Sequence, residues 1–294
     1  MEVAGSTPLA AAPSRALDFL ELGKPRITFL VVMTAAVGYA LGAPSFQAGV
    51  FAAVLVGTAL VAGGASALNQ CAESEADGRM RRTCSRPLPA GRLSGSEALA
   101  FGLAISAGGL LVLAAATNAL TFLLGLAALA SYVLVYTPLK RRTSLCTVVG
   151  AVPGAIPPLM GWAAARGALD RTAWALFAVL FLWQLPHFLA LSWMYREDYA
   201  RGGFPMLAVT DEDGSSTGRQ ALLYAAALLP VSLAAGLFAD SGRVFLWGGL
   251  VAGLGFLLCA ALFARRREVA WARRLFLGSV LYLPAVLSLM VFDR

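Results

Sequence analysis

Long apolar segments separated by shorter polar ones dominate the pattern along the chain. Nine are present, near 26–43, 48–68, 95–115, 118–136, 146–166, 171–191, 220–239, 244–264 and 273–292. A helix of roughly 20 mostly apolar residues crosses the hydrocarbon core of a bilayer. Because the runs are continuous and do not alternate with polar residues, they favour helices over the strands of a membrane barrel. The pattern therefore predicts an all-α fold, a polytopic membrane bundle of about nine transmembrane helices.

Basic residues collect at one end of these predicted helices. With the N-terminus placed in the cytoplasm, 19 of the 23 Lys and Arg residues fall on the cytoplasmic side. The four on the opposite side are Arg166, Arg171, Arg243 and Arg294. Since short cytoplasmic loops of membrane proteins are rich in Lys and Arg, this split predicts a cytoplasmic N-terminus and supports nine spans.

The polar residues before the first span indicate a short tail. Residues 1–24 hold three acids but only two bases, Arg15 and Lys24. A mitochondrial transit peptide would be rich in Arg and poor in acids. We therefore expect 1–24 to be a cytoplasmic tail and 25–294 to be a single transmembrane domain. The protein is expected in a bacterial inner membrane.

The composition narrows the class of protein further. Hydrophobic residues make up 59% of the 294 residues, charged residues only 13%, and the mean hydropathy is +0.74. A soluble chain of this length has too little interior for so many apolar side chains, which excludes a soluble enzyme, a disordered chain and a DNA-binding domain. The net charge of +7 then reflects membrane topology, and no nucleic-acid partner is expected. The four cysteines show no CxxC pair and no metal-ligand spacing.

Two long polar loops, near 69–94 and 192–219, contain 8 of the 16 acidic residues. In the first, Asn69, Glu73 and Asp77 are spaced four residues apart, so a continuing helix would place all three on one face. Two carboxylates and an amide oxygen are hard ligands of the kind that Mg²⁺ takes, and this ion is usually shared with substrate phosphates. The spacing predicts a Mg²⁺ site on the cytoplasmic side.

Arginines follow this acidic stripe directly, and guanidinium groups match phosphate oxygens. They are Arg79, Arg81, Arg82, Arg86 and Arg92. A Mg²⁺–diphosphate complex fits such a surface. From the spacing alone two other interpretations stay open: a loop that is basic only for topology, with acids that simply pair with it, or an ion-binding transporter.

The loop also carries a sequence signature. The stretch 69–92 reads Asn69-x3-Glu73-x3-Asp77, then Met80-x-Arg82-Thr83-x2-Arg86-Pro87-Leu88-Pro89-Ala90-Gly91-Arg92. It resembles the signature of the heme O synthase (protoheme IX farnesyltransferase) family, within the UbiA superfamily of intramembrane prenyltransferases. Further agreeing segments follow in the expected order, at 24–28, 136–141, 154–162, 186–188, 195–199 and 203–207. The resemblance covers roughly 20–210.

The resemblance implies a reaction. Farnesyl diphosphate ionises with the help of Mg²⁺, and a vinyl group of protoheme IX (heme B) attacks the allylic cation. Water then completes the hydroxyethylfarnesyl group of heme O, and diphosphate leaves. The implied cofactor is Mg²⁺, with heme B as a substrate rather than a cofactor. The lipid bilayer surrounds the enzyme, and a heme A synthase is a possible partner in supplying heme to terminal oxidases.

The resemblance also implies residue roles. Asn69, Glu73 and Asp77 would hold one Mg²⁺, and Asp198 a second. Four bases would bind the diphosphate oxygens: Arg82, Arg86, Lys140 and Arg141. His187, the only histidine in the chain, is a candidate for heme contact, at the iron or at a propionate. The alternative for His187 is a packed histidine whose ring bonds a neighbouring helix.

The sequence departs from the wider superfamily in its second loop. Other members carry a second Asp-x3-Asp pair, whereas here Asp198 is followed four residues on by Gly202. Glu197 is therefore a further candidate ligand. The acids at 211–213 favour a solvated polar turn.

Other functions agree less well with these residues. A prenyltransferase for a quinone or chlorophyll precursor is the alternative within the same class. A transporter for an anionic lipid or heme is the alternative outside it. Transporter sites usually lie near the bilayer midplane, whereas the polar chemistry here lies at the cytoplasmic ends of the spans.

Overall fold

The structure is a computed structural model that describes residues 14–294. Within these residues, nine helical segments are long and apolar enough to cross a membrane, which confirms the predicted bundle. They are α2 (Pro25–Gly42), α3 (Ala48–Arg79), α4 (Gly95–Ala116), the segment Ala119–Leu139, α7 (Cys146–Arg166), α8 (Arg171–Met194), α11 (Ser215–Phe238), α12 (Arg243–Arg266) and α13 (Val269–Phe292).

The segment Ala119–Leu139 is not one regular helix. It consists of α5 (Ala119–Ala130), the π-helix η1 (Ser131–Tyr136) and α6 (Thr137–Leu139). Pro138 follows the π-helix and has no N–H to donate. Such single π turns occur frequently at functional sites, and this one ends beside the polar stripe of α3.

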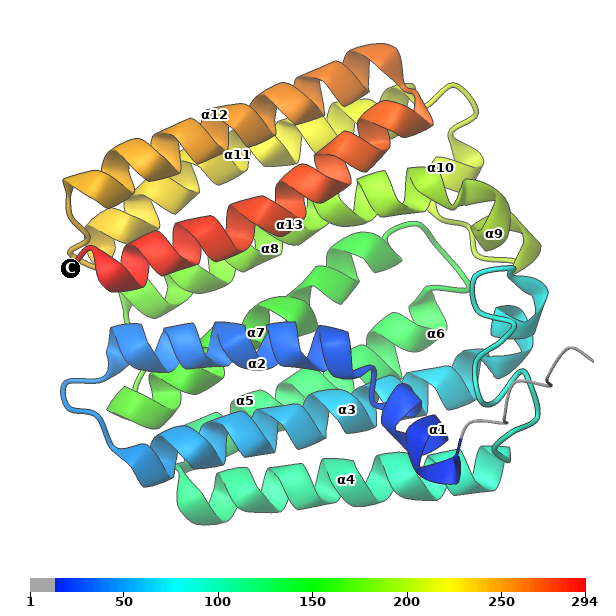
Figure 1. The fold of residues 1–294 in the computed structure, drawn as a ribbon, viewed down its shortest axis with the longest axis horizontal. Helices are drawn as coiled ribbons and strands as arrows, with labels where there is room; N and C mark the ends of the chain where they lie inside the picture. The colour runs from blue at the N-terminus through cyan, green and yellow to red at the C-terminus, as the bar shows by residue number, and fades with distance from the viewer. Residues whose placement is uncertain (1–13) are drawn as a thin grey trace, which may run out of the picture.

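The spanning helices form two groups that lie side by side (Figure 1). α2, α3, α4, α5 and α7 pack together, and α8, α11, α12 and α13 form the second group. The groups meet where α7 contacts α8 and where α13 contacts α2. The polar ends of α3 and α6, with the short helices α9 (Arg196–Arg201) and α10 (Leu207–Thr210), gather at one end of the bundle.

Small residues let α2 and α7 approach closely. A Cβ atom added to Gly38 would overlap the carbonyl oxygen of Pro158, and one added to Gly161 would overlap that of Ala35. Membrane helices associate through such close backbone contacts because lipid gives no hydrophobic drive for helix pairing. These close contacts lie toward the end of α2, and they fix the position of this helix against α7.

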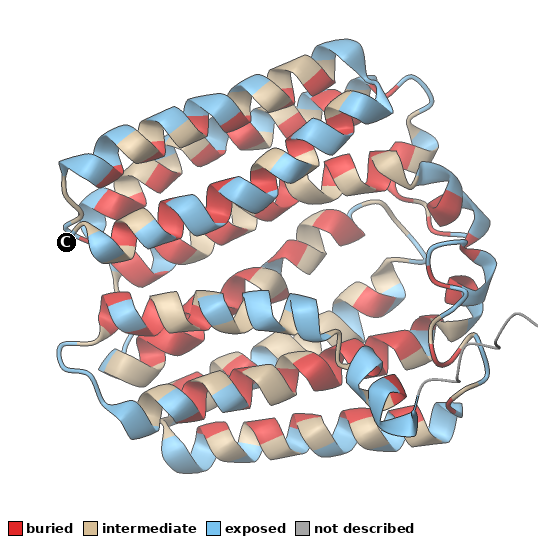
Figure 2. Ribbon diagram, viewed as in Figure 1, coloured by how far each residue is buried: buried red, intermediate tan, exposed pale blue. Residues whose placement is uncertain are grey.

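Exposed residues lie along the outer faces of the bundle (Figure 2), and many of them are large apolar side chains. Large exposed side chains occur on several spanning helices, for example Leu111, Val251 and Leu281. Buried residues lie mainly where helices face each other. An apolar surface of this extent is typical of a lipid-facing protein, so the chain is a multi-pass membrane protein.

The predicted tail contains a helix. Residues 1–13 lie outside the described residues, and α1 (Arg15–Leu22) follows them. Asp18 of α1 is buried and accepts a 2.7 Å hydrogen bond from Nε of Arg92. Leu17 and Leu20 are exposed on this short helix. The Asp18–Arg92 pair ties α1 to the loop that follows α3.

Candidate active site

Helix α3 extends well past the second predicted span and carries the acidic stripe. Asn69, Glu73 and Asp77 lie on the same face and are only 3%, 2% and 1% exposed. A buried carboxylate is costly unless it is paired or hydrogen-bonded. The contacts of these three side chains therefore define the site.

Glu73 pairs with a lysine that follows α6. Nζ of Lys140 lies 2.8 Å from Oε2 of Glu73, and it also lies 4.4 Å from the centre of the Phe204 ring. Burial lowers the pKa of Lys140, but the Glu73 carboxylate and nearby tyrosines outweigh burial and raise this pKa above its ordinary value. Lys140 thus keeps its positive charge beside the acidic stripe.

Asp77 pairs with an arginine of the loop that follows its own helix. Nη1 of Arg86 lies 2.6 Å from Oδ2 of Asp77, and the Thr83 hydroxyl donates a 2.8 Å hydrogen bond to the carbonyl oxygen of Asp77. The loop therefore folds back over the end of α3. The predicted diphosphate ligand Arg86 is brought directly to the stripe.

Asn69 and Arg141 connect α3 to the end of the π-helical span. Nδ2 of Asn69 donates to the Thr137 hydroxyl at 3.1 Å, and that hydroxyl donates to the carbonyl oxygen of Tyr132 at 2.9 Å. The amide oxygen of Asn69 takes no part in this hydrogen bond. The exposed Arg141 donates a 2.8 Å hydrogen bond from Nη2 to the carbonyl oxygen of Ala72.

Asp198 joins the two polar loops. Its carboxylate accepts hydrogen bonds from the backbone N–H groups of Arg81 and Arg82, at 3.1 Å and 3.3 Å, and pairs with Arg201. Burial raises the pKa of Asp198, but these hydrogen bonds outweigh burial and hold this pKa below its ordinary value. Asp198 therefore fixes α9 against the loop after α3, although three groups already occupy its oxygens.

Arg82 lies against two tyrosines from the second loop. Its guanidinium carbon lies 5.2 Å from the ring centre of Tyr195 and 6.0 Å from that of Tyr199. Guanidinium groups are attracted to aromatic faces at such distances. The structure thus holds Arg82 beside α9 rather than in an ion pair with the acidic stripe.

The site offers oxygen ligands that the protein leaves bare. Oε1 of Glu73 and Oδ1 of Asp77 are buried without a hydrogen-bond partner among the described residues. No group of three or more His, Cys, Asp or Glu side chains suited to a metal occurs within residues 14–294. The two bare carboxylate oxygens of Glu73 and Asp77 are hard ligands of the kind that Mg²⁺ takes, since this ion needs few protein oxygens and completes its shell with water and substrate phosphates.

One basic residue of the site, Lys24, was not among the residues that the sequence predicted for it. Lys24 adopts a left-handed conformation (φ 48°) directly before α2. Burial, followed by the positive charges of Arg86 and Lys140, lowers the pKa of Lys24 to about 7, while Glu73 and Asp77 oppose this shift. Lys24 opens one of the segments that resemble the family, which was the available signal for a role at this site.

His187 lies away from the polar loops. It belongs to the spanning part of α8, eight residues or about 12 Å along the helix before Tyr195. Its Nδ1 atom lies 2.7 Å from the hydroxyl of Ser279 on α13. The rings of Trp183 and Phe276 flank the imidazole, with centroids at 5.1 Å and 4.7 Å.

The acids at 211–213 hold structural contacts. Asp211 accepts hydrogen bonds at 2.6 Å and 2.8 Å from the backbone N–H and the hydroxyl of Thr217, in the first turn of α11. Asp213 pairs with Arg267 at 2.9 Å. These contacts agree with the predicted polar turn.

The chain has many relatives of known type. The family model described as "UbiA prenyltransferase family" matches residues 31–281. A protoheme IX farnesyltransferase from Solibacter usitatus is 48% identical over 287 residues, which cover 94% of this chain and 98% of that protein. A protoheme IX farnesyltransferase from Koribacter versatilis is 42% identical over 301 residues, which cover 98% and 97%.

Solved structures share the fold. A digeranylgeranylglyceryl phosphate synthase has a TM-score of 0.79 at 16% identity, covering 95% of this chain and 98% of its own. A UbiA homolog from Archaeoglobus fulgidus, bound to GPP and Mg²⁺, has a TM-score of 0.67 at 16% identity, covering 93% and 99%. At this level of identity the likeness establishes the arrangement of helices.

Proposed function

Because the chain belongs to the UbiA prenyltransferase family, we propose that it transfers the farnesyl group of farnesyl diphosphate to a vinyl group of protoheme IX. Water adds in the same reaction, and the products are heme O and diphosphate. The observation that carries the proposal is the pair of buried carboxylates, Glu73 and Asp77, each with one oxygen paired to a base and the other bare. The names of the curated relatives support the choice of donor and acceptor.

The residues of the site fit the ionisation of an allylic diphosphate. Asn69, Glu73 and Asp77 would hold a Mg²⁺ ion, which when bound neutralises the charge that develops on the leaving diphosphate. Asp198 would hold a second ion only if it gave up a present hydrogen bond. The UbiA homolog that was solved with GPP and Mg²⁺ supports a divalent ion.

Basic side chains at the site would bind the phosphate oxygens. Lys140 and Arg86 already carry N–H donors to the same face as the bare carboxylate oxygens. A preorganised set of donors stabilises the developing charge without having to reorganise during the reaction. We propose five side chains for this role: Lys24, Arg82, Arg86, Lys140 and Arg141.

An apolar cluster beside the polar groups would protect the cation from water. Tyr199, Phe204 and Met206 are buried together, with Tyr136 and Leu139 packed against them. The exclusion of water prevents premature hydrolysis of a reactive carbon centre. The farnesyl chain would continue from here between apolar helices.

The hydrogen bonds of Ser279 favour a tautomer of His187 that leaves Nε2 free to bind iron. The Ser279 hydroxyl donates its one proton to the carbonyl oxygen of Phe276 at 2.5 Å, so it accepts from Nδ1–H of His187. The lone pair then lies on Nε2, the atom with which a neutral imidazole binds iron. We therefore propose Nε2 of His187 as an axial ligand of the heme substrate. Loss of the His-type visible spectrum of bound heme in His187→Ala, with binding of farnesyl diphosphate unchanged, would support this role.

The charge distribution supports an orientation for the site. Most Lys and Arg residues lie at the end of the bundle that carries the acidic stripe. We propose that this end faces the cytoplasm of a bacterial cell, with the protein in its inner membrane. We also propose 25–294 as one domain, 1–24 as a cytoplasmic extension of it, and a heme A synthase as a partner that consumes the product.

One assay tests the proposed reaction. Membranes that contain the protein are incubated with farnesyl diphosphate, Mg²⁺ and heme B, and the products are separated and identified by mass. Heme O is the expected product. When 4-hydroxybenzoate replaces heme B as the acceptor, no prenylated product is expected. Absence of heme O from well-folded protein, or prenylation of 4-hydroxybenzoate instead, would contradict the proposal.

A further inference from the structure

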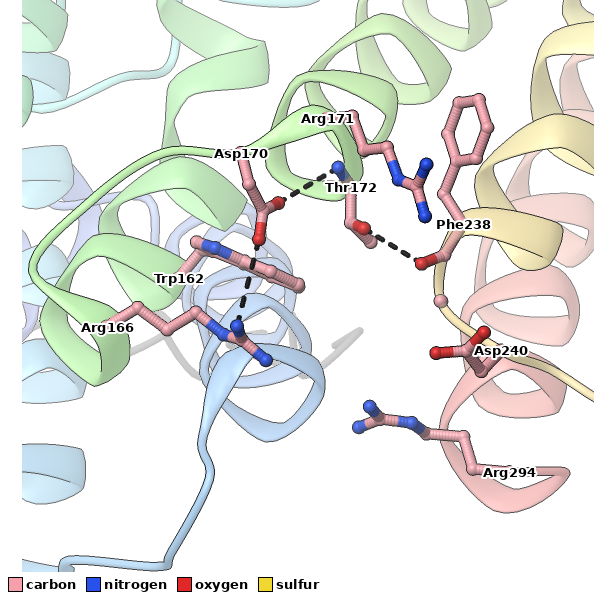
Figure 3. A pocket seen from close by; sticks show the side chains of 9 residues that line it. Trp162, Arg166, Asp170, Arg171, Thr172, Phe238, Asp240 and Arg294 are labelled. Carbon is pink, nitrogen blue, oxygen red and sulfur yellow. Dashed lines mark hydrogen bonds and ion pairs between the residues drawn. The ribbon is translucent and has the colours of Figure 1, made fainter.

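A pocket of about 440 Å³ lies at the end of the bundle opposite the candidate active site (Figure 3). Helix α2 relates the two places, because it begins next to Lys24 and ends at Gly42, which contacts the pocket residue Arg166. Its 18 residues separate the two ends by about 27 Å. Nothing in the proposed prenyl transfer uses this pocket.

The pocket lies between the two groups of helices. Its walls come from the end of α7, the start of α8, the turn between α11 and α12, and the end of α13. Nε of Arg166 donates to the carbonyl oxygen of Gly42 at 2.7 Å, and the Thr172 hydroxyl donates to that of Phe238 at 2.9 Å. Nη1 of Arg294 donates to the carbonyl oxygen of Leu41 at 3.1 Å. These bonds fix the rim of the pocket.

Three guanidinium groups face the same space. Figure 3 shows the side chains of Arg166, Arg171 and Arg294 directed toward the centre of the pocket. Arg171 lies 5.3 Å from the ring centre of Phe238, and Arg294 is held by backbone carbonyls. The described contacts of these two arginines are with neutral groups, and neither guanidinium forms an ion pair within the described residues.

Two carboxylates also line the pocket, and only one is committed elsewhere. Asp170 caps α8 by accepting from the backbone N–H groups of Thr172 and Ala173, at 2.9 Å and 3.2 Å, and it lies 3.9 Å from Arg166. Asp240 is exposed on the rim. The three guanidinium side chains of the lining outnumber its two carboxylate side chains, so Arg171 and Arg294 have N–H donors to offer to an anion.

We propose that this pocket binds the phosphate of an anionic phospholipid head group. Guanidinium forks match phosphate oxygens in two-point hydrogen bonds. The pocket lies where spanning helices end, which is the depth at which lipid head groups lie. Leu237 and Val244 are exposed beside the α11–α12 turn and offer an apolar surface to acyl chains, and Trp174 is exposed one turn into α8. An aromatic residue at this depth is typical of a membrane interface.

Lipid-dependent thermal stability tests the proposal. Purified protein in detergent is heated with phosphatidylglycerol, with phosphatidylcholine, or with inorganic phosphate alone. We expect phosphatidylglycerol to raise Tm more than either of the others. Equal stabilisation by inorganic phosphate would indicate a free-phosphate site. Equal stabilisation by phosphatidylcholine, whose head group has no net charge, would indicate no preference for an anionic lipid. Either result would overturn the assignment to an anionic phospholipid.

Variants locate the effect. In Arg171→Ala/Arg294→Ala, native mass spectrometry should show phosphatidylglycerol affinity reduced by roughly tenfold for each arginine removed. Arg243→Ala is the matched control, since Arg243 lies at the same end but outside the pocket, and it should bind as the wild type does. Arg171→Lys/Arg294→Lys keeps both charges and should retain part of the affinity, which separates lost binding from a folding defect. Full affinity in the alanine double variant would refute the proposal.

Discussion

Glu73 and Asp77 are buried carboxylates that each form an ion pair and also present an oxygen without a hydrogen-bond partner. One oxygen of each is paired with a base, and the other is buried and bare. The pairing makes burial of the charge tolerable, and the bare oxygen is what a divalent ion requires. A substitution that keeps the shape and removes the charge therefore separates catalysis from folding.

We expect Asp77→Asn to reduce kcat for heme O formation by about 100-fold or more, because the metal and the leaving group lose an anionic ligand. The protein should still insert and elute as a single species from size exclusion. Glu75→Gln is the matched control, since Glu75 lies on the same helix but is exposed and pairs only with Arg79. Near-normal turnover in Asp77→Asn would remove this residue from the site.

Lys24 gives the site a pH dependence near neutrality. Its pKa is lowered to about 7, so the free enzyme loses this positive charge as pH rises through that value. We expect kcat/KM for farnesyl diphosphate to fall over the same range, because kcat/KM reports ionisations of the free enzyme. Lys24→Arg keeps the charge and should shift the fall to higher pH. Identical pH profiles for the two proteins would show that the ionisation of Lys24 does not cause the fall in kcat/KM.

The spacing of Asn69, Glu73 and Asp77 was readable from the sequence because a helix keeps positions four apart on one face. The sequence did not predict that Lys24 lies at the site. Its position depends on its own left-handed backbone conformation and on the packing of α2 against α7. Neither feature leaves a periodic signal in the residues around it.

Among the elements, α9 shows how a loop can be organised without a hydrophobic pattern. The region 192–219 was predicted as a polar loop, yet it contains α9 and α10. Its six residues, four of which are charged, show no periodicity that would predict a helix. Its position comes from Asp198, which accepts hydrogen bonds from the loop that follows α3.

We expect Asp198→Ala to loosen the loop after α3. Backbone N–H groups at 81 and 82 lose their acceptor, so hydrogen exchange should quicken over 81–93 while the spanning helices stay protected. The same loosening should occur in the wild type at low pH: the lowered pKa of Asp198 makes its contribution complete above pH 3.8 and lost as pH falls through the folded-state value. Asp213→Asn should leave exchange at 81–93 unchanged.

The α2–α7 contact should be intolerant of a single methyl group. We expect Gly161→Ala to destabilise the protein by about 1–3 kcal/mol, because the new Cβ overlaps the backbone of α2. Gly108→Ala on α4 meets open space and should be neutral or slightly stabilising. Thermal unfolding in detergent measures both, and equal Tm values for the two variants would contradict the close-packing argument.

At the scale of the whole molecule, hydropathy and charge predicted the number of spans because each depends on local composition. They did not predict which loops meet, since Asp198 and Arg81 are brought together by helices far apart in the chain. The pocket at the opposite end was hidden for the same reason. Arg171 and Arg294 each look like an ordinary base at a helix end, and only the fold brings them to one space.

The length of α3 has a consequence for how an amphiphilic donor is handled. Asn69 and Asp77 lie about 30 Å and 45 Å from the start of the helix, so the stripe begins where a hydrocarbon core of about 30 Å ends. The proposed donor would therefore bind with its ionic half among the polar side chains at the end of the bundle and its isoprenoid half at the depth of the hydrocarbon core. Bond cleavage would then divide the molecule along that same boundary: diphosphate would leave at the polar end, and the farnesyl group would pass to the heme acceptor on the apolar side.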